Sequence, residues 1–187
     1  MMRLDEKEDK RPYSKVQIQN AFFSLLEQES YQHLTIAMIL DEAQISRRTF
    51  YRHYPNKQAI VEDYLESLCD GFCTQLKLIV KETSLYDVLV ACLDYFYQEV
   101  HHLILLSKNN ILYLLLENFK NNELLIVEQL RGSERFSHYN SENFYLIKFL
   151  IGGCFTVIES ALQQTPPPPP EVIASDLVAL LHSNINQ

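Results

Sequence analysis

Residues 34–57 constrain the fold more than any other stretch, because two helix-start signals follow each other closely there. Thr35 and Ser46 are good N-caps, and each follows an apolar residue that can pack against the next helical turn as a hydrophobic staple. Pro55 stops the second helix, and Asn56 can cap a third. The sequence therefore predicts two short helices joined by a three-residue turn, followed by the start of another helix.

This pair of short helices has the shape of a helix-turn-helix. In that motif the second helix enters the major groove of DNA and leads with its N-terminal residues. Phe50 and Tyr54 fall on the core side of the second helix, and its other side is basic and polar. The candidate DNA-binding residues are Thr35, Arg47, Arg48, Thr49, Tyr51, Arg52, His53 and Lys57.

Three cations stand at predicted helix starts, where the helix dipole prefers anions. Arg47 and Arg48 open the second helix, and Lys57 opens the next one. Each should cost about 0.3–1 kcal/mol in isolation, but a bound phosphate reverses that sign. The alternative is that all three are ordinary solvated surface charges. Their concentration within one motif favours DNA binding, with Lys57 and Thr35 at phosphates and with Arg47, Arg48 and Thr49 at base edges.

The stretch from Ser46 to Lys57 resembles the DNA-binding motif of the TetR family of transcriptional regulators, and the match extends back to Thr35. Two positions depart from the family pattern. Gln44 stands where the family usually has glycine in the turn, so either the turn is altered or Gln44 takes an ordinary conformation. Arg48 stands where many members have a small residue, which leaves the preferred DNA sequence open.

The net charge of −8 is unevenly distributed along the chain. Residues 1–60 carry 9 Lys and Arg against 8 Asp and Glu, whereas residues 61–187 carry 7 against 16. The acidity therefore belongs to the second part, and the first part is not repelled from DNA as a whole. A charged N-terminus and the absence of any long apolar run predict a cytoplasmic protein without a membrane segment.

Helical periodicity continues through the rest of the chain, so we expect an all-α protein of about nine helices. A helix over 13–30 should complete a three-helix head with the helix-turn-helix, and a helix over 57–80 should link the head to the second part. We expect a DNA-binding domain over residues 1–56 and an effector-binding and dimerisation domain over residues 57–187. Further helices are expected over 85–102, 111–130 with an interruption at Asn121-Asn122, 143–164 and 171–183, with 103–106 as a connector and 131–140 as a loop.

Aromatic residues and a histidine pair are dense in the helices expected over 57–80, 85–102 and 111–130. An apolar cavity with a few polar groups is the usual form of a small-molecule site. The alternative is that these side chains only fill a core and that the histidines contact the last carbonyls of their helix. The candidate effector-pocket residues are Tyr64, Tyr95, Phe96, His101, His102, Tyr113 and Phe119.

Gly152 and Gly153 interrupt a broad apolar helix face, where each glycine costs about 1 kcal/mol relative to alanine. Close approach of another backbone would explain them, and two apolar C-terminal helices suit a four-helix interface between two copies. The alternative is that both helices pack within one chain. The candidate interface residues are Phe144, Ile151, Gly152, Gly153, Phe155, Ile158, Leu177 and Leu181.

This C-terminal half resembles, more weakly, the regulatory domain of a Gram-positive TetR subgroup that includes regulators of dihydroxyacetone operons. The likeness rests on Ile151-Gly152-Gly153 and on the Pro166–Pro170 run before the last helix. The resemblance implies a homodimeric regulator of a palindromic operator, most simply a repressor released by a small-molecule effector. A coactivator controlled by a protein partner is the alternative within the same fold.

An enzyme or metal-binding helical protein is the alternative from another class. The sequence has no Gly-rich phosphate loop, HExxH or GxSxG motif. Its four cysteines form no CxxC pair, and Cys69 and Cys73 alone are too few ligands for a metal site. We therefore expect no catalytic residues, no metal and no cofactor, and reduced buried thiols.

Overall fold

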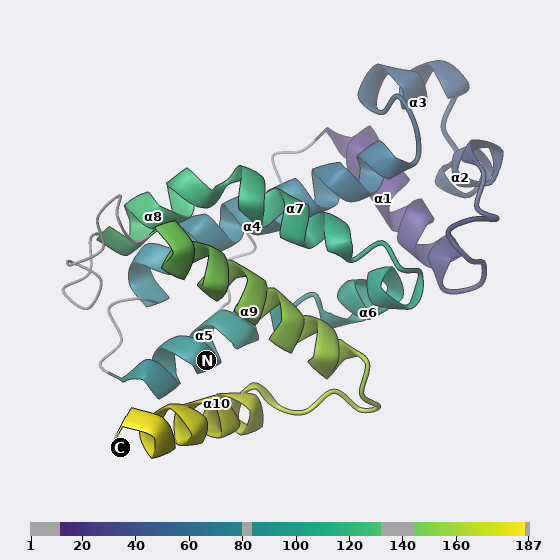
Figure 1. The fold of residues 1–187 in the computed structure, drawn as a ribbon. Helices are drawn as coiled ribbons and strands as arrows, with labels where there is room; N and C mark the ends of the chain where they lie inside the picture. The colour runs from purple at the N-terminus through teal and green to yellow at the C-terminus, as the bar shows by residue number, and fades with distance from the viewer. Residues whose placement is uncertain (1–11, 80–83, 132–143, 186–187) are drawn as a thin grey trace, which may run out of the picture. The chain divides into compact units, whose positions relative to one another are not determined.

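The computed structural model describes residues 12–79, 84–131 and 144–185, and all regular secondary structure in these ranges is α-helical (Figure 1). The predicted all-α class is confirmed, with ten helices in these ranges rather than about nine. None of these ten helices is long and apolar enough to cross a membrane. In chain order they are α1 (Tyr13–Leu26), α2 (Ile36–Ala43), α3 (Arg47–His53), α4 (Gln58–Ile79), α5 (Leu85–Tyr97), α6 (Val100–Lys108), α7 (Tyr113–Asn121), α8 (Glu123–Arg131), α9 (Phe144–Leu162) and α10 (Pro170–Ile185).

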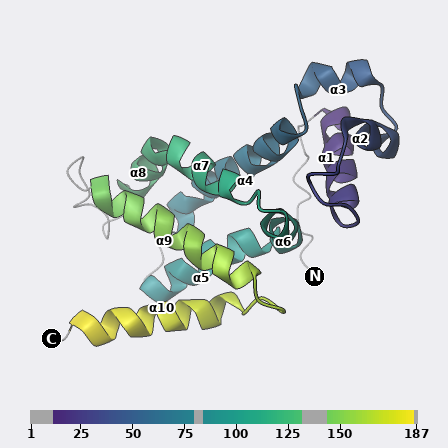
Figure 2. The same ribbon diagram turned by 45° about the vertical axis from the view of Figure 1, so that its right-hand side comes forward.

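The chain divides into two compact units after Val61, in the first turn of α4. In unit 1, α1 packs against α2 and α3 (Figure 2). The helix over 13–30 was predicted too long, because residues 27–30 are all polar and exposed and offer nothing to bury. The core of unit 1 contains side chains that are at most 2% exposed, namely Ile18, Phe22, Leu34, Ile39, Phe50, Tyr54 and Ile60.

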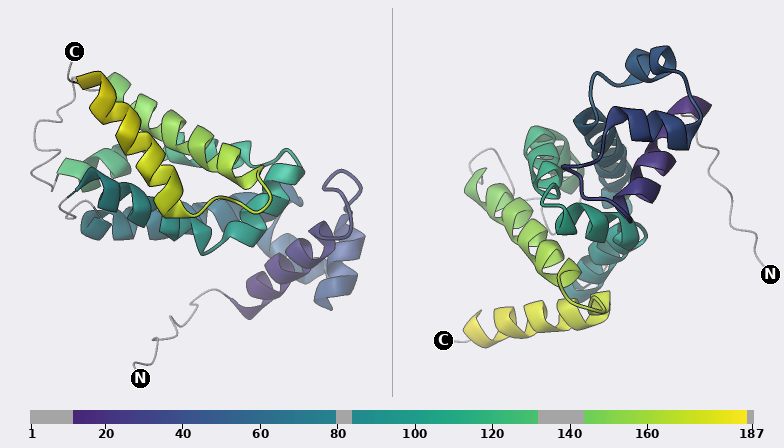
Figure 3. Two further views of the ribbon diagram at one scale, coloured as in Figure 1. Left: turned by 90° about the horizontal axis from the view of Figure 1, so that it is seen from below. Right: turned by 90° about the vertical axis from the view of Figure 1, so that its right-hand side faces the viewer.

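In unit 2, α10 lies against α5, and α9 lies against α6 and α7 (Figure 3). The prediction of one helix over 85–102 was wrong, because α5 and α6 are separated at Gln98 and Glu99. The prediction of a connector over 103–106 was also wrong, because these residues lie inside α6. Three of its four leucine and isoleucine side chains are buried, so packing extends the helix through a stretch that looks too short on its own.

Asn122 separates α7 from α8, which confirms the predicted interruption of the helix over 111–130. Its side-chain Nδ2 donates to the Asn118 carbonyl at 3.0 Å, and its own carbonyl accepts the Ile126 N–H at 3.1 Å. Asparagine often competes with the helix backbone in this way. Apart from Arg131, which ends α8, the loop predicted over 131–140 lies outside the described residues.

The core of unit 2 contains a cluster of packed aromatic rings. The centroid of Phe72 lies 4.9 Å from that of Phe96 and 5.9 Å from that of Phe119. Tyr95 adds a fourth ring, 5.5 Å from Phe72, and its hydroxyl donates to the Leu68 carbonyl at 2.9 Å. Aromatic pairs at these separations add to the stability given by burial alone.

Candidate nucleic-acid interface

Each helix of the predicted DNA-binding motif begins at the capping residue expected from the sequence. The side-chain oxygens of Thr35, Ser46 and Asn56 each accept the amide N–H three residues ahead, at 3.3, 3.1 and 3.0 Å. A cap of this kind is typically worth about 1 kcal/mol. Local sequence therefore places the start of α3, and with it the direction of its first turn.

The turn between α2 and α3 is closed by Gln44 in the left-handed region, with φ 53° and ψ 43°. The turn therefore has the backbone conformation that glycine usually adopts, and Gln44 does not take the ordinary conformation that was one of the two alternatives. For an L-residue this conformation costs about 1–2 kcal/mol. The Gln44 side-chain Nε2 donates to the Asp41 carbonyl at 2.6 Å, which offsets part of that cost.

α3 buries one side and presents the other to solvent. Phe50 is fully buried, and Tyr54 just beyond the helix is 2% exposed. On the opposite side Tyr51 is 50% exposed, and three arginines are exposed. The exposed α3 face therefore combines positive charge with an aromatic ring, and its members are Arg47, Arg48, Tyr51 and Arg52.

Two predicted DNA contacts on α3 already have partners within unit 1. The hydroxyls of Thr49 and Ser46 are 2.9 Å apart, so Thr49 takes part in capping its own helix. His53 is half-buried, and its Nε2 is 2.8 Å from the Ser14 hydroxyl on α1. Both side chains hold α3 in place as well as lying near its outer surface.

Lys57 is tethered to the segment that leads from α1 to α2. Its ammonium donates to the carbonyls of Tyr31 at 2.6 Å and Leu34 at 2.7 Å, with a longer contact of 3.4 Å to Gln32. It also lies 4.4 Å from the centroid of the Tyr31 ring. Burial lowers the pKa of Lys57. This tether could not be predicted from the sequence, because the three carbonyls belong to backbone more than twenty residues away.

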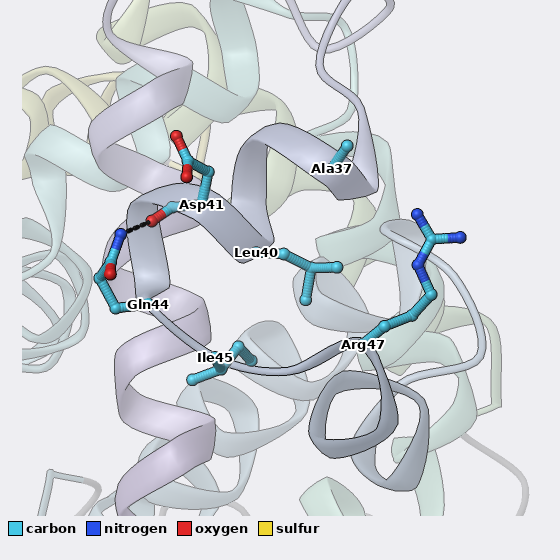
Figure 4. Close-up of a pocket in the computed structure, with 6 residues that line it drawn as sticks. All are labelled: Ala37, Leu40, Asp41, Gln44, Ile45 and Arg47. Atoms are coloured by element: carbon cyan, nitrogen blue, oxygen red, sulfur yellow. Dashed lines mark hydrogen bonds between the residues drawn. The ribbon is translucent and has the colours of Figure 1, made fainter.

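An open hollow of about 390 Å³ lies where α2, the turn and the start of α3 meet (Figure 4). In Figure 4 Arg47 reaches out from the start of α3, and the dashed line marks the bond from Gln44 to Asp41. The hollow lies at the turn, whereas the exposed α3 face runs along the helix. Its lining residues are Ala37, Leu40, Asp41, Gln44, Ile45 and Arg47.

The residues predicted for an effector pocket are divided among three places in unit 2. Tyr95, Phe96 and Phe119 belong to the packed aromatic cluster. Tyr64 donates to a Glu99 carboxylate oxygen at 3.0 Å, and His102 contacts that same oxygen at 3.0 Å.

The two remaining members of that set, His101 and Tyr113, are exposed, Tyr113 to 52%. A separate hollow of unit 2, of about 370 Å³, is lined by none of the seven. A high density of aromatic residues is as typical of a packed core as of a ligand pocket, and the sequence alone could not distinguish the two.

Six of the eight predicted dimer-interface residues belong to α9, and Leu177 and Leu181 belong to α10. Phe155 is 7% and Ile158 is 3% exposed, so the chain itself already buries both. Gly153 is exposed, and a Cβ added at Gly152 or Gly153 would meet no atom within 4 Å. Ile151 and Leu177 are half-buried, whereas the side chains of Phe144 and Leu181 lie outside those described.

Two exposed aromatics on α9 were missed. Tyr145 is 82% and Phe149 is 73% exposed, and with Gly153 they follow one another at a spacing of four residues. This spacing places all three on one helical face, opposite the buried Ile147 and Phe155. The i, i+4, i+8 pattern was present in the sequence and could have identified this face.

Among the described residues no group of three or more His, Cys, Asp and Glu is placed to hold a metal ion. Cys69 and Cys73 are buried free thiols, and burial is the main cause that raises the pKa of each. A thiol with a raised pKa is a poor nucleophile and a poor metal ligand at neutral pH.

Comparison with known proteins supports the motif at sequence level. The family described as bacterial regulatory proteins, tetR family, matches residues 20–64. An uncharacterized HTH-type transcriptional regulator of Bacillus subtilis, YxbF, is 33% identical over 58 residues, which are 31% of this chain and 15% of that protein. The nucleoid occlusion factor SlmA of Alteromonas mediterranea is 30% identical over 96 residues, which are 51% of this chain and 46% of that protein. The chain thus spans less than half the length of each of these relatives.

Solved structures share the fold over most of the chain. A TetR transcriptional regulator from Streptococcus agalactiae has a TM-score of 0.62 and 24% identity, covering 89% of this chain and 92% of its own. The dihydroxyacetone kinase operon activator DhaS has a TM-score of 0.59 and 16% identity, covering 93% and 97%. The capped helix-turn-helix and the family match over residues 20–64 agree, so this part of the chain is a helix-turn-helix of the TetR type, and the chain as a whole has the fold of the solved structures named above.

Proposed function

We propose that this protein is a DNA-binding transcriptional regulator that acts as a homodimer on a palindromic operator. The observation that carries the proposal is the exposed α3 face, where Arg47, Arg48 and Arg52 stand on solvent around Tyr51. α3 is held by its cap and by two buried aromatics, so this face is presented rigidly. A rigid basic helix with its first turn exposed is what major-groove reading requires.

Within this proposal the arginines at the start of α3 contact base edges, because an arginine can bind guanine through two parallel hydrogen bonds. Thr35 lies at the N-terminus of α2, where free amides suit a phosphate. The tether of Lys57 brings its charge to the same end of α2 through the Leu34 carbonyl. These two residues are therefore proposed to position unit 1 on the backbone, and not to read sequence.

A single helix-turn-helix makes few contacts, and two copies related by a two-fold axis would read two half-sites. The α9 face formed by Tyr145, Phe149 and Gly153 supports the dimer, because large exposed aromatics commonly mark a protein interface. No atom of the described residues lies within 4 Å of a Cβ added at Gly153, which leaves room for the backbone of a second copy.

Repression relieved by a small-molecule effector is the proposed mode of action. Coactivation under the control of a protein partner is the second candidate, because DhaS, which is named an operon activator, has the same fold at 16% identity. An effector can release DNA only if it binds two conformations unequally, and tenfold release needs about 1.4 kcal/mol of difference.

A gel-shift titration with DNA that flanks the protein's own coding region tests DNA binding. We expect a palindromic fragment to be retained by the wild type and lost by the Arg47→Ala, Arg48→Ala double variant, since each bidentate base contact is worth about 1–3 kcal/mol. Lys108→Ala, which removes one exposed charge from the end of α6, is the control and should bind as the wild type does. Equal binding by the double variant would contradict the assignment of the exposed α3 face.

A further inference from the structure

The hollow of about 370 Å³ in unit 2 is lined by residues of α4 and α8 and differs from the aromatic cluster in the chemistry of its walls. α4 contributes a carboxylate, a thiol, a hydroxyl and an ammonium group, and α8 contributes one apolar side chain and one amide. A volume of this size suits a small metabolite. The lining residues are Asp70, Cys73, Thr74, Lys77, Leu125 and Gln129.

Gln129 is the unusual member of this set. Its side chain is only 8% exposed, yet its Oε1 is buried without a hydrogen-bond partner among the described residues. Buried polar atoms are nearly always satisfied, and leaving an acceptor unpaired typically costs about 1–3 kcal/mol. Gln129 also lines the hollow, so a ligand bound there is a candidate source of the missing donor.

The charges of the α4 wall are arranged in order along the helix. Asp70, Thr74 and Lys77 follow at i, i+4 and i+7 and therefore share one face. The two charged residues stand about 10 Å apart along the axis, at a rise of about 1.5 Å per residue. The Thr74 hydroxyl donates to the Asp70 carbonyl at 2.9 Å, which leaves its oxygen lone pairs available. The wall thus offers a negative end, a positive end and acceptors between them.

The remaining two members form a neutral surface. Cys73 is 3% exposed, and burial, with a smaller contribution from the charge of Asp70, raises the pKa of its thiol. Leu125, one turn before Gln129 on α8, is 36% exposed and supplies an apolar wall. A ligand that fits here has a short apolar body between two opposite charges.

We propose that the hollow between α4 and α8 binds a small zwitterion, with its cationic group toward Asp70, its anionic group toward Lys77 and an N–H or O–H donated to Gln129 Oε1. Binding itself depends only on the geometry of unit 2. The further step, that this zwitterion is the effector, rests on the proposed function. α4 is the element through which it would act, since the helix that begins at Gln58 carries the hollow on its later turns.

The test uses the full chain and three probes that share a four-carbon skeleton, namely γ-aminobutyrate, butyrate and butylamine. Thermal unfolding and the NMR signals of the Gln129 side-chain amide are followed as each probe is added at millimolar concentration. We expect γ-aminobutyrate to raise the unfolding temperature, to shift the Gln129 signals and to bind about tenfold more tightly than either single-charge probe. No shift with γ-aminobutyrate, or equal binding of all three probes, overturns the proposal.

Two variants locate the site. Gln129→Met keeps the length of the side chain and removes the unpaired acceptor. We therefore expect a higher unfolding temperature without probe, and no further rise when γ-aminobutyrate is added. Gln163→Met, at an exposed glutamine beyond α9, is the matched control and should change neither. If γ-aminobutyrate still raises the unfolding temperature of Gln129→Met, the assignment is overturned.

Lys77→Gln provides the same test on an exposed side chain that the fold does not need, with Lys108→Gln as its control. We expect Lys77→Gln to bind γ-aminobutyrate about tenfold more weakly, and unchanged binding overturns the proposal. DNA titrations with and without γ-aminobutyrate distinguish the proposed binding site from the proposed effector role. If the probe binds unit 2 but operator affinity is unchanged, the site stands and the effector role fails. If the wild type retains no DNA at all, the proposed function fails and the site does not.

Discussion

The tether of Lys57 gives the sharpest quantitative expectation, because one ammonium group joins segments that are far apart in sequence. Lys57→Met keeps most of the side-chain volume and removes every donor. It loses two short bonds to the Tyr31 and Leu34 carbonyls, at 2.6 and 2.7 Å, and the contact with the Tyr31 ring at 4.4 Å. Hydrogen bonds to charged groups are worth about 1.5–3 kcal/mol each when well shielded, and an exposed cation–π contact about 0.5–1 kcal/mol.

The site of Lys57 is only half-buried, and the freed carbonyls can bind water, so each bond is reduced to about 1 kcal/mol. We therefore expect Lys57→Met to lower the free energy of unfolding of unit 1 by about 2–3 kcal/mol. Urea unfolding followed by circular dichroism measures it, with Lys108→Met on exposed α6 as the control. A loss within about 0.5 kcal/mol, the range of ordinary surface substitutions, would refute the reasoning.

The same variant examines the DNA role predicted for Lys57 from sequence. If the ammonium also reaches a phosphate in the complex, the slope of log affinity against log salt should flatten by about one unit. The titration is made at a temperature where Lys57→Met is fully folded, so that stability and binding are measured separately. A clear loss of stability with an unchanged slope would leave Lys57 as a tether alone.

Three further substitutions test the described contacts. Gly153→Leu should raise the stability of one chain by up to about 1 kcal/mol, because nothing lies within 4 Å of its Cβ and glycine is unfavourable inside a helix, while sedimentation shows monomers in place of dimers; a variant that stays dimeric would contradict the proposed α9 interface. Gly71→Ala should lower the free energy of unfolding by about 1–3 kcal/mol, because its Cβ would collide with the Tyr95 hydroxyl; unchanged urea unfolding would contradict that packing. Gln44→Val should lose more than about 1 kcal/mol in the left-handed turn, while Gln44→Gly should be at least as stable as the wild type; a stable Gln44→Val would contradict the positive φ.

The helix-turn-helix could be predicted nearly to the residue, because every rule that builds it acts within one helical turn. Thr35, Ser46 and Asn56 each cap the helix that follows by bonding an amide three residues ahead. The exposed α3 face follows from the same short range, since a buried Phe50 fixes which side of the helix faces away. Helical class elsewhere was equally predictable from periodicity.

Other features depend on contacts that periodicity does not encode. The ammonium of Lys57 binds carbonyls more than twenty residues away, and Gln44 takes the left-handed conformation in the turn between two helices that both pack on α1. The split between α5 and α6 and the burial of Phe155 and Ile158 were likewise set by neighbouring helices. Local capping and propensity act between residues a few positions apart, whereas burial is decided by which helices meet, and for that reason the hollow beside Gln129 becomes visible only once α4 and α8 are placed together.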